Sequence, residues 1–183
     1  LSYALTFHLK WISIFYQGSS NMTIAVELFS QYTKKSLGTS LSRGTLNTLQ
    51  VNLGKLCNMA CLHCHVEAGP KRTEQMSGEL VDQLLELLAY LPQIEIVDLT
   101  GGAPELNVHF RRLVTACKKS GRHVIDRCNL TILFEQGQED LAEFLAEQSV
   151  EIVASLPCYL EDNVECQRGK GSFGKSVLAL QKL

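Results

Sequence analysis

The residues most able to do chemistry lie in one short stretch, Cys-Asn-Met-Ala-Cys-Leu-His-Cys-His, which begins at Cys57. Its three cysteines, Cys57, Cys61 and Cys64, are separated by three residues and then by two. Thiolates at this spacing can converge from one tight loop on one metal centre, but they are one ligand short of the usual four-cysteine iron–sulfur site. A [4Fe–4S] cluster held in this way would keep one iron open for a further ligand.

Two other interpretations of the same loop stay open on these residues alone. Zinc accepts a tetrahedral set of three cysteines and one histidine, which His63 or His65 would complete. The chain would then be a zinc-binding structural or interaction module. A thioredoxin-type redox pair of Cys61 and Cys64 is the other interpretation, but it leaves Cys57 without a role.

The composition is ordinary for one soluble globular domain, with 183 residues, 45% of them apolar and 20% charged. The formal net charge of −2 gives no indication of a nucleic-acid partner. The chain has seven cysteines, and three of them crowd into one loop. This pattern favours metal or redox chemistry in a reducing compartment over a disulfide framework, so we expect a cytoplasmic protein.

The first 45 residues give weaker signals. The apolar run at the start of the chain contains His8 and Lys10 and is too short to span a bilayer, so no membrane association is expected. We interpret residues 1–21 as an upstream or disordered extension, with Met22 as the natural start. Residues 22–45 are expected to form a short helix followed by a linker rich in Ser, Gly and Thr.

Residues 46–183 alternate between strand-like and helix-like segments. Strands are expected over 46–53, 94–99, 124–126 and 151–156, and helices over 77–91, 108–120, 140–148 and from 173 onward. Ser77 has the side chain of a typical N-cap. The apolar stripes expected to face the core are Leu80, Leu84, Leu87, Leu88 and Leu91, then Phe110, Leu113, Val114 and Cys117, then Leu141, Phe144 and Leu145.

This β-α-β-α-β-α-β-α order predicts an α/β fold, in which helices cover a parallel sheet through right-handed crossovers. Four strands cannot close a barrel of six or eight, so we expect the chain to be the N-terminal part of a longer protein. In such folds the site lies at the carboxyl ends of the strands. The unusual residues follow strands one to four in turn: the cysteine loop, the Gly101-Gly102 pair, Asn129, and Ser155 with Cys158.

The chemistry of four of these residues suggests their roles. Gly101 and Gly102 let backbone groups approach a ligand closely. Asn129 offers both a donor and an acceptor, which suits ribose hydroxyls. Arg168 could hold a carboxylate in a bidentate fork.

The three-cysteine loop after the first strand, with a Gly-Gly loop after the second, resembles the radical S-adenosylmethionine (SAM) superfamily. The resemblance implies a partial (β/α)6 TIM-like barrel, truncated here after about four βα units. It also implies that Cys57, Cys61 and Cys64 bind a [4Fe–4S] cluster whose open iron takes the amino and carboxylate groups of SAM. An electron donor such as flavodoxin or ferredoxin would reduce the cluster, and SAM would be cleaved to methionine and a 5′-deoxyadenosyl radical.

The same resemblance implies which residues contact SAM. The stretch from Arg168 to Phe173 looks like the Arg-Gly segment that many members carry after the fourth strand, where the arginine meets the SAM carboxylate. His63 stands where an aromatic residue is usual, and Ala103 replaces the glutamate that binds the SAM amino group, so backbone groups or Glu105 would serve instead. The implied SAM-binding residues are His63, Thr100, Gly101, Gly102, Ala103, Asn129, Ser155 and Arg168.

Longer segments resemble one narrower family, the arsenosugar-biosynthesis radical SAM proteins. These segments are 49–70, 99–106, 126–131 and 155–159. That family is thought to add a deoxyadenosyl group to a trivalent methylated arsenical. Cys158 is therefore a candidate catalytic residue, whose soft thiolate would hold the arsenical, and an inert loop cysteine is the alternative.

The remaining motifs predict no chemistry. Cys117 lies on an apolar helix face and is expected in the core. Cys128 is expected to be structural, near the mouth of the site, and Cys166 has no clear role. The run 169–176 matches the phosphate-loop pattern, but no expected strand precedes it directly, so we do not interpret it as a nucleotide site.

Overall fold

The computed structural model describes residues 20–39 and 44–183. The chain divides into two compact units, residues 1–44 and 45–183, which are described separately. In the first unit, α2 (Ser20–Leu37) is the helix expected within residues 22–45, and it begins two residues before that range. Apart from its last two residues, the proposed extension over residues 1–21 lies outside the described residues.

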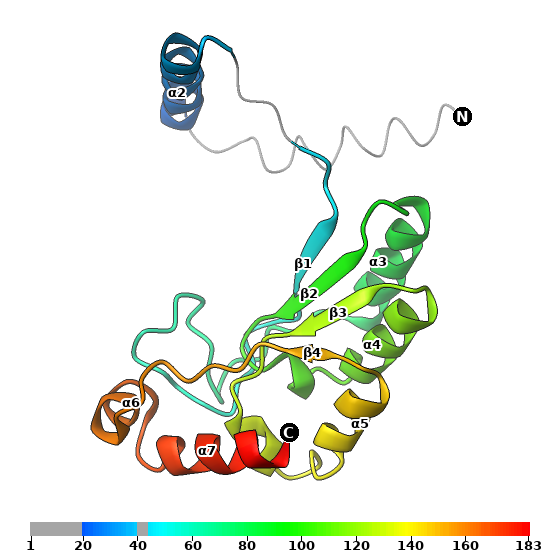
Figure 1. Ribbon diagram of the computed structural model, residues 1–183, viewed down its shortest axis with the longest axis vertical. Coiled ribbons are helices and arrows are strands. Elements are labelled where there is room, and N and C mark those ends of the chain that lie inside the picture. Colours follow the sequence, from blue (N-terminus) through cyan, green and yellow to red (C-terminus); the bar gives the residue numbers. More distant parts are fainter. Residues whose placement is uncertain (1–19, 40–43) are drawn as a thin grey trace. The chain divides into compact units, whose positions relative to one another are not determined.

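The second unit is built on one parallel sheet, as the sequence predicted. Its strands lie side by side in chain order (Figure 1). They are β1 (Thr48–Asn52), β2 (Ile96–Thr100), β3 (His123–Asp126) and β4 (Glu151–Ile152). The ladder continues past the short β4, because the N–H of Val153 donates to the Asp126 carbonyl at 2.8 Å and that of Ser155 to the Cys128 carbonyl at 2.9 Å. The loops after all four strands therefore emerge at the same edge.

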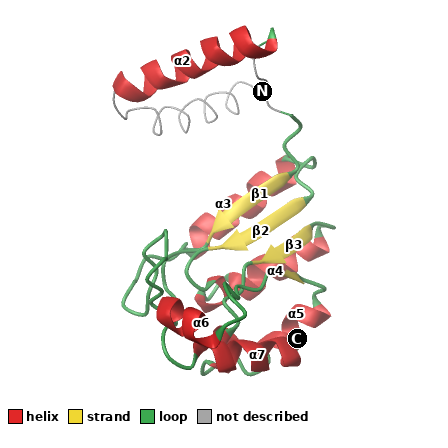
Figure 2. Cartoon of the chain, turned by 60° about the vertical axis from the view of Figure 1, so that its left-hand side comes forward, coloured by secondary structure: helices red, strands yellow, loops and turns green. Residues whose placement is uncertain are grey.

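The four expected helices follow the four strands. They are α3 (Gly78–Tyr90), α4 (Phe110–Lys119), α5 (Leu141–Glu147) and α7 (Ser172–Lys182). Figure 2 shows α3 and α4 on one face of the strands. The fold therefore has the α/β architecture of a partial barrel, with four βα units in the described chain.

Three short helical segments in the loops were not predicted. They are η1 (Pro104–Leu106), η2 (Thr131–Phe134) and α6 (Glu161–Arg168). The segment that forms α6 is polar, and it buries only Val164 and Arg168. It therefore carries no apolar stripe from which a helix could be inferred.

The buried face of α3 differs from the prediction. Ser77 is the N-cap as expected, since its Oγ accepts the N–H of Leu80 at 3.3 Å. However, the buried residues are Val81 and Leu88, whereas Leu80 and Leu87 are 44% and 42% exposed. Leucines surround much of this helix, so the packing against the sheet selects the buried face, and the sequence period alone does not.

The other predicted stripes are closer to the structure. Phe110, Leu113, Val114 and Cys117 of α4 are all buried, and so are Leu141 and Leu145 of α5. Phe144 is only partly buried and lies under the Arg111 guanidinium, 4.8 Å from the ring centre to Cζ. No helix in the described ranges 20–39 and 44–183 is long and apolar enough to cross a bilayer.

Two neighbouring leucines of α3 test this packing. We expect Leu88→Ala to lower the free energy of unfolding by about 2–5 kcal/mol, because it leaves a cavity in the core. Leu87→Ala removes an exposed side chain and is expected to cost about 1 kcal/mol or less. Urea unfolding followed by circular dichroism measures both, and equal losses would contradict the observed orientation of the helix.

Candidate active site

The loops after the four strands surround a cavity of about 380 Å³. Contributions come from the cysteine loop, the Gly-Gly loop, the loop after β3, the segment after β4, and the end of α6. The lining residues are Cys57, Met59, Cys61, His63, Cys64, His65, Ala68, Gly102, Asn129, Ser155, Leu156, Pro157 and Arg168. The loops after the four strands therefore meet at the carboxyl edge of the sheet, although Gly101 and Cys158 lie outside the cavity lining.

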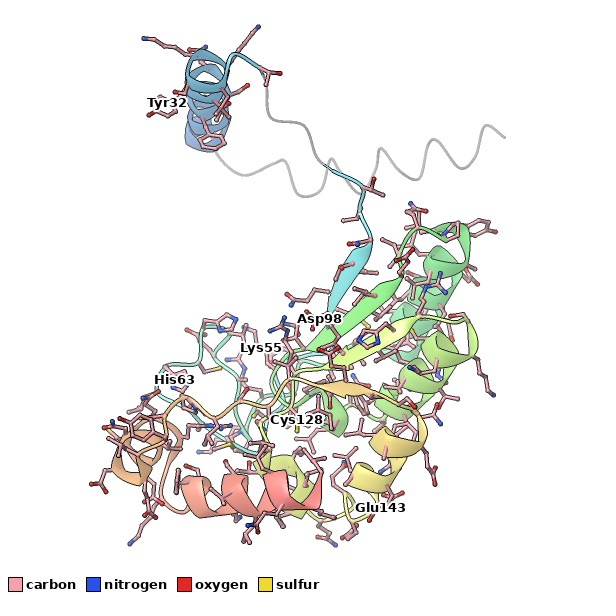
Figure 3. The ribbon with its side chains drawn as sticks, in the orientation of Figure 1. Tyr32, Lys55, His63, Asp98, Cys128 and Glu143 are labelled. Carbon is pink, nitrogen blue, oxygen red and sulfur yellow. The ribbon has the colours of Figure 1, made fainter. Side chains whose placement is uncertain are left out.

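The cysteine loop is closed by backbone hydrogen bonds between its two sides. Near its base the N–H of Met76 donates to the Leu53 carbonyl at 3.0 Å, and the N–H of Lys55 donates to the Glu74 carbonyl at 2.8 Å. Farther along, the N–H of Gly69 donates to the Lys55 carbonyl at 3.0 Å. The three cysteines therefore sit on a segment whose ends are held, and Figure 3 shows its outer part, with His63, near α6.

The three sulfurs of this loop are free, and those of Cys57 and Cys64 accept N–H donors. The Cys57 Sγ accepts the N–H of Met59 at 3.4 Å and the amide Nδ2 of Asn129 at 3.6 Å, and the Cys64 Sγ accepts the N–H of Ala68 at 3.3 Å. Burial raises the pKa of Cys57, although these two N–H donors act in the opposite direction. A bound cation would reverse the effect of burial, because the thiolate is the form that ligates metals.

The spacing of the sulfurs favours a cluster over a single zinc ion. Around one Zn²⁺, Zn–S bonds of about 2.3 Å place sulfurs about 3.8 Å apart. Within residues 20–39 and 44–183, the only Cys, His, Asp and Glu donors that gather in a group within 4.8 Å are those of Glu105, Asp126 and Cys128. No three donors of the cysteine loop are gathered within that distance, as they would be around one Zn²⁺. Thiolates that each bind a different iron stand farther apart, so the loop fits an iron–sulfur cluster better than a single zinc ion.

The Gly-Gly loop contacts the backbone of the cysteine loop. The N–H of Gly102 donates to the Gly54 carbonyl and that of Ala103 to the Leu56 carbonyl, both at 2.9 Å. A Cβ on Gly102 would lie 2.3 Å from the Leu56 oxygen, and Gly101 has a φ of +143°. We expected the glycine backbone to approach a ligand closely. In the structure, this backbone approaches the cysteine loop closely instead.

Only one of the four predicted positions in this segment lines the cavity. Gly102 does, whereas Thr100, Gly101 and Ala103 do not. Glu105, the suggested substitute for binding the SAM amino group, is buried and also lies outside the cavity lining. Glu105 stands two residues after Ala103, the usual position of this glutamate, and it therefore lies in η1, where it and Pro104 are buried.

Asn129 lines the cavity, but its amide is already occupied. Its Nδ2 donates to the Asn58 Oδ1 at 2.8 Å, and its Oδ1 accepts the Thr131 hydroxyl and the N–H of Ile132, each at 3.1 Å. Together with its contact to Cys57, these bonds tie the loop after β3 to the cysteine loop. Asn129 therefore lies at the site, where the sequence analysis placed it. However, its amide N–H and oxygen, which were expected to bind a ribose, already form hydrogen bonds within the protein.

Arg168 is buried at the cavity wall, at the end of α6. Its guanidinium donates to the carbonyls of Ser155 and Asn129, the latter at 2.8 Å, and lies 3.3 Å from the Met59 sulfur. Across the described part of the chain, no carboxylate forms an ion pair with it. The cavity therefore has an uncompensated positive charge, which suits an anionic group. Met59 was not predicted, and only its place between two cysteines could have suggested it.

The other cysteines occupy different environments. Cys117 is buried in the core as predicted, and burial raises its pKa to about 11. Cys166 is exposed. Cys158 is half-buried and is not part of the cavity lining, although the adjacent Pro157 is. Its Sγ accepts the N–H of Leu160 at 3.4 Å and the Asn163 amide at 3.5 Å, and these bonds lower its pKa.

The phosphate-loop match over 169–176 spans the turn between α6 and the first residues of α7. A working phosphate loop would follow directly from a buried strand, and here α6 intervenes after β4. The structure thus supports the interpretation of this match as a coincidence of sequence.

Comparison with known proteins agrees with this geometry. The family model of the Radical SAM superfamily matches residues 51–176. The chain belongs to the radical SAM superfamily. Members of this superfamily use a [4Fe–4S] cluster and SAM, and the cysteine loop and its cavity are the parts of this chain that suit them.

This chain aligns with only a limited part of each relative. The chain is 28% identical to the mycofactocin maturase MftC of Mycolicibacterium smegmatis over 130 residues, 69% of this chain and 31% of that protein. It is 32% identical to the putative peptide biosynthesis protein YydG of Bacillus subtilis over 63 residues, 34% of this chain and 20% of that protein. The structure of anSMEcpe with bound AdoMet aligns with a TM-score of 0.59 at 20% identity, covering 75% of this chain and 40% of that one. The chain thus spans about a third or less of the curated relatives it matches.

The close contact between the Gly-Gly loop and the cysteine loop predicts that a methyl group on Gly102 would disturb the metal site. We expect Gly102→Ala to lose most of its iron after anaerobic reconstitution, because the added Cβ would displace the segment that carries Cys57. Gly174→Ala is the matched control, since nothing lies within 4 Å of that position. Iron analysis on folded protein measures the effect, and full iron content in Gly102→Ala would contradict this role of the contact.

Proposed function

We propose that Cys57, Cys61 and Cys64 hold the [4Fe–4S] cluster of this radical SAM enzyme and that SAM occupies the adjoining cavity. The observation that carries the proposal is the placement of three free thiols and the unpaired Arg168 guanidinium around one cavity. When bound, the reduced cluster supplies the electron that cleaves SAM. The protein positions the cofactor and limits the access of solvent.

Each side of the cavity has a proposed role toward SAM. The Arg168 guanidinium would bind the SAM carboxylate, since it lines the cavity and its charge has no carboxylate partner in the described chain. The carbonyls of Ser155 and Asn129 accept only some of its five N–H donors. The backbone at His63 would meet the adenine, and Gly102 and Ser155 would contact the remainder of the ligand. Asn129 would act mainly by holding Cys57 and the cysteine loop in place.

A trivalent methylated arsenical is our first proposal for the substrate, and deoxyadenosyl transfer is the reaction. The support is the family resemblance of the loops, together with the depressed pKa of Cys158 next to a residue of the cavity wall. A thiolate is a soft ligand and suits a soft arsenic centre. The free cysteines of the site suit a reducing cytoplasm, and a flavodoxin or ferredoxin is the proposed electron donor.

A peptide substrate is the second candidate. One relative is described as a putative peptide biosynthesis protein, and it shares 32% identity with this chain over 63 residues. A peptide would not need a soft thiolate. The role of Cys158 therefore separates the two candidates.

The cofactor proposal is tested first by anaerobic reconstitution with iron and sulfide. We expect about four irons per chain and an absorbance change on addition of SAM. Replacing Cys57, Cys61 and Cys64 by Ala should abolish both, while Cys117→Ser, which changes a core cysteine, should keep them. One tightly bound zinc in the cysteine loop and no iron would refute the proposal.

The role of Arg168 is tested separately. We expect Arg168→Gln to retain the iron and to weaken SAM binding about 10- to 100-fold, because a charged hydrogen bond contributes roughly 1.5–3 kcal/mol. Titration of the SAM-dependent absorbance change measures this affinity. Arg111→Gln, at an exposed ion pair with Asp140, is the control and should bind SAM normally. Unchanged affinity in Arg168→Gln would contradict carboxylate binding.

The substrate candidates are separated by equilibrium binding of a trivalent methylated arsenical. We expect Cys158→Ser to bind it at least about tenfold more weakly, whereas Cys166→Ser, at an exposed cysteine, should bind it normally. Equal affinity in all three chains would remove the arsenical argument and leave the peptide as the better candidate.

A further inference from the structure

Two carboxyl groups and one thiol lie close together in the core, outside the cavity lining. They belong to Glu105 in η1, Asp126 at the end of β3, and Cys128 in the loop that follows. One ligand atom from each lies within 4.8 Å of the other two, and all three residues are buried. Figure 3 shows Cys128 inside the fold, near the ends of the strands.

The carboxylate oxygens of this group have no hydrogen-bond partner outside the group in the described part of the chain. Neither carboxylate oxygen of Glu105 or of Asp126 accepts a hydrogen bond in the described part of the chain. No lysine, arginine or histidine of that part forms an ion pair with them. Two buried carboxylates without donors or counterions are expensive, and a native core leaves few such groups unexplained.

The thiol of Cys128 adds a possible metal ligand to the two carboxyl groups. Its Sγ accepts the N–H of Leu130 at 3.3 Å, a contact like that of the Met59 N–H to the Cys57 Sγ at 3.4 Å. Asp126 and Cys128 are two residues apart on an extended segment, which directs both side chains to the same side of the sheet. Glu105 approaches them from the loop after β2.

We propose that Glu105, Asp126 and Cys128 form a structural metal site for a zinc-like divalent cation. Zinc accepts thiolate and carboxylate ligands together, whereas magnesium and calcium prefer oxygen alone. Ligands about 2.0–2.3 Å from one ion stand roughly 3–4 Å apart, which agrees with a group gathered within 4.8 Å. Binding would release the protons of the thiol and of any protonated carboxyl group.

The proposed metal site lies next to two residues of the cavity lining in the sequence. Glu105 lies three residues after Gly102, and Cys128 lies directly before Asn129, and both of these neighbours line the cavity. A cation held by the three side chains would link the loops after β2 and β3 from the core side. The competing explanation is a neutral pair of carboxylic acids that hydrogen bond to one another, because burial raises the pKa of both groups. In that alternative the Cys128 thiol would act only as a further hydrogen-bond donor to Glu105, and it would bind no metal.

The test uses the full chain with Cys57, Cys61 and Cys64 replaced by Ser, so that the cysteine loop binds no metal. We expect this chain to bind one Co²⁺ with a sulfur-to-cobalt charge-transfer band, and to carry about one zinc by elemental analysis after treatment with a weak chelator. Adding Cys128→Ser should abolish the band. Adding Cys117→Ser, at another buried cysteine, should leave it unchanged.

A second measurement covers the case in which Cys128→Ser does not fold. A strong chelator should lower the melting temperature of the triple variant, and Glu105→Gln with Asp126→Asn should remove this sensitivity along with the zinc. Absence of cobalt and zinc from the folded triple variant would overturn the proposal in favour of the neutral acid pair. A charge-transfer band that survives Cys128→Ser would overturn it as well.

Discussion

The structure depends on the close contact between the loops that follow β1 and β2. Two backbone hydrogen bonds, from Gly102 to Gly54 and from Ala103 to Leu56, join these loops where a side chain on Gly102 would have no room. The cysteine loop is long and polar, and this contact gives it a fixed support at the edge of the sheet. The contact sets the position of the thiols relative to the loop after β2, while Asn129 and Arg168 set it relative to the loops after β3 and β4.

The opposite side of the cavity is held by charge and hydrogen bonding. Arg168 reaches from the end of α6 to the carbonyls after β3 and β4, and Asn129 reaches from the loop after β3 to Asn58 and Cys57. Thiolates suit a metal cluster, and the nearby guanidinium suits a carboxylate. These two properties are the physical basis of our proposal that the cluster and SAM bind side by side.

The loops after β2 and β3 have two chemically distinct sides. Gly102 and Asn129 line the cavity, whereas Glu105 and Cys128, a few residues away, enter the core beside Asp126. The same short segments therefore carry the cavity lining and a buried acidic group. A change in the buried group would be transmitted to the cavity through one to three residues of backbone.

Much of this arrangement is available from the sequence. The alternation of apolar strands and amphipathic helices predicted the parallel sheet, and the spacing of Cys57, Cys61 and Cys64 after the first strand predicted their common loop. Periodic patterns and motif spacing are local properties, so they can be read along the chain. The prediction was weaker where the pattern was ambiguous. In α3, leucines on several faces concealed which of Leu87 and Leu88 is buried, and in α6 a polar helix gave no periodic signal.

The sequence by itself determined the order of the elements, the three-cysteine loop and the edge of the sheet at which the site forms. Only the tertiary structure decided that Arg168 is buried without a carboxylate partner in the described chain, that the Asn129 amide is already bonded, and that Glu105 faces the core with Asp126 and Cys128. These properties depend on which groups meet across distances of tens of residues along the chain. Hydrogen bonding and desolvation act between residues that are neighbours in space, so they cannot be inferred from the pattern of residues along a short segment of sequence.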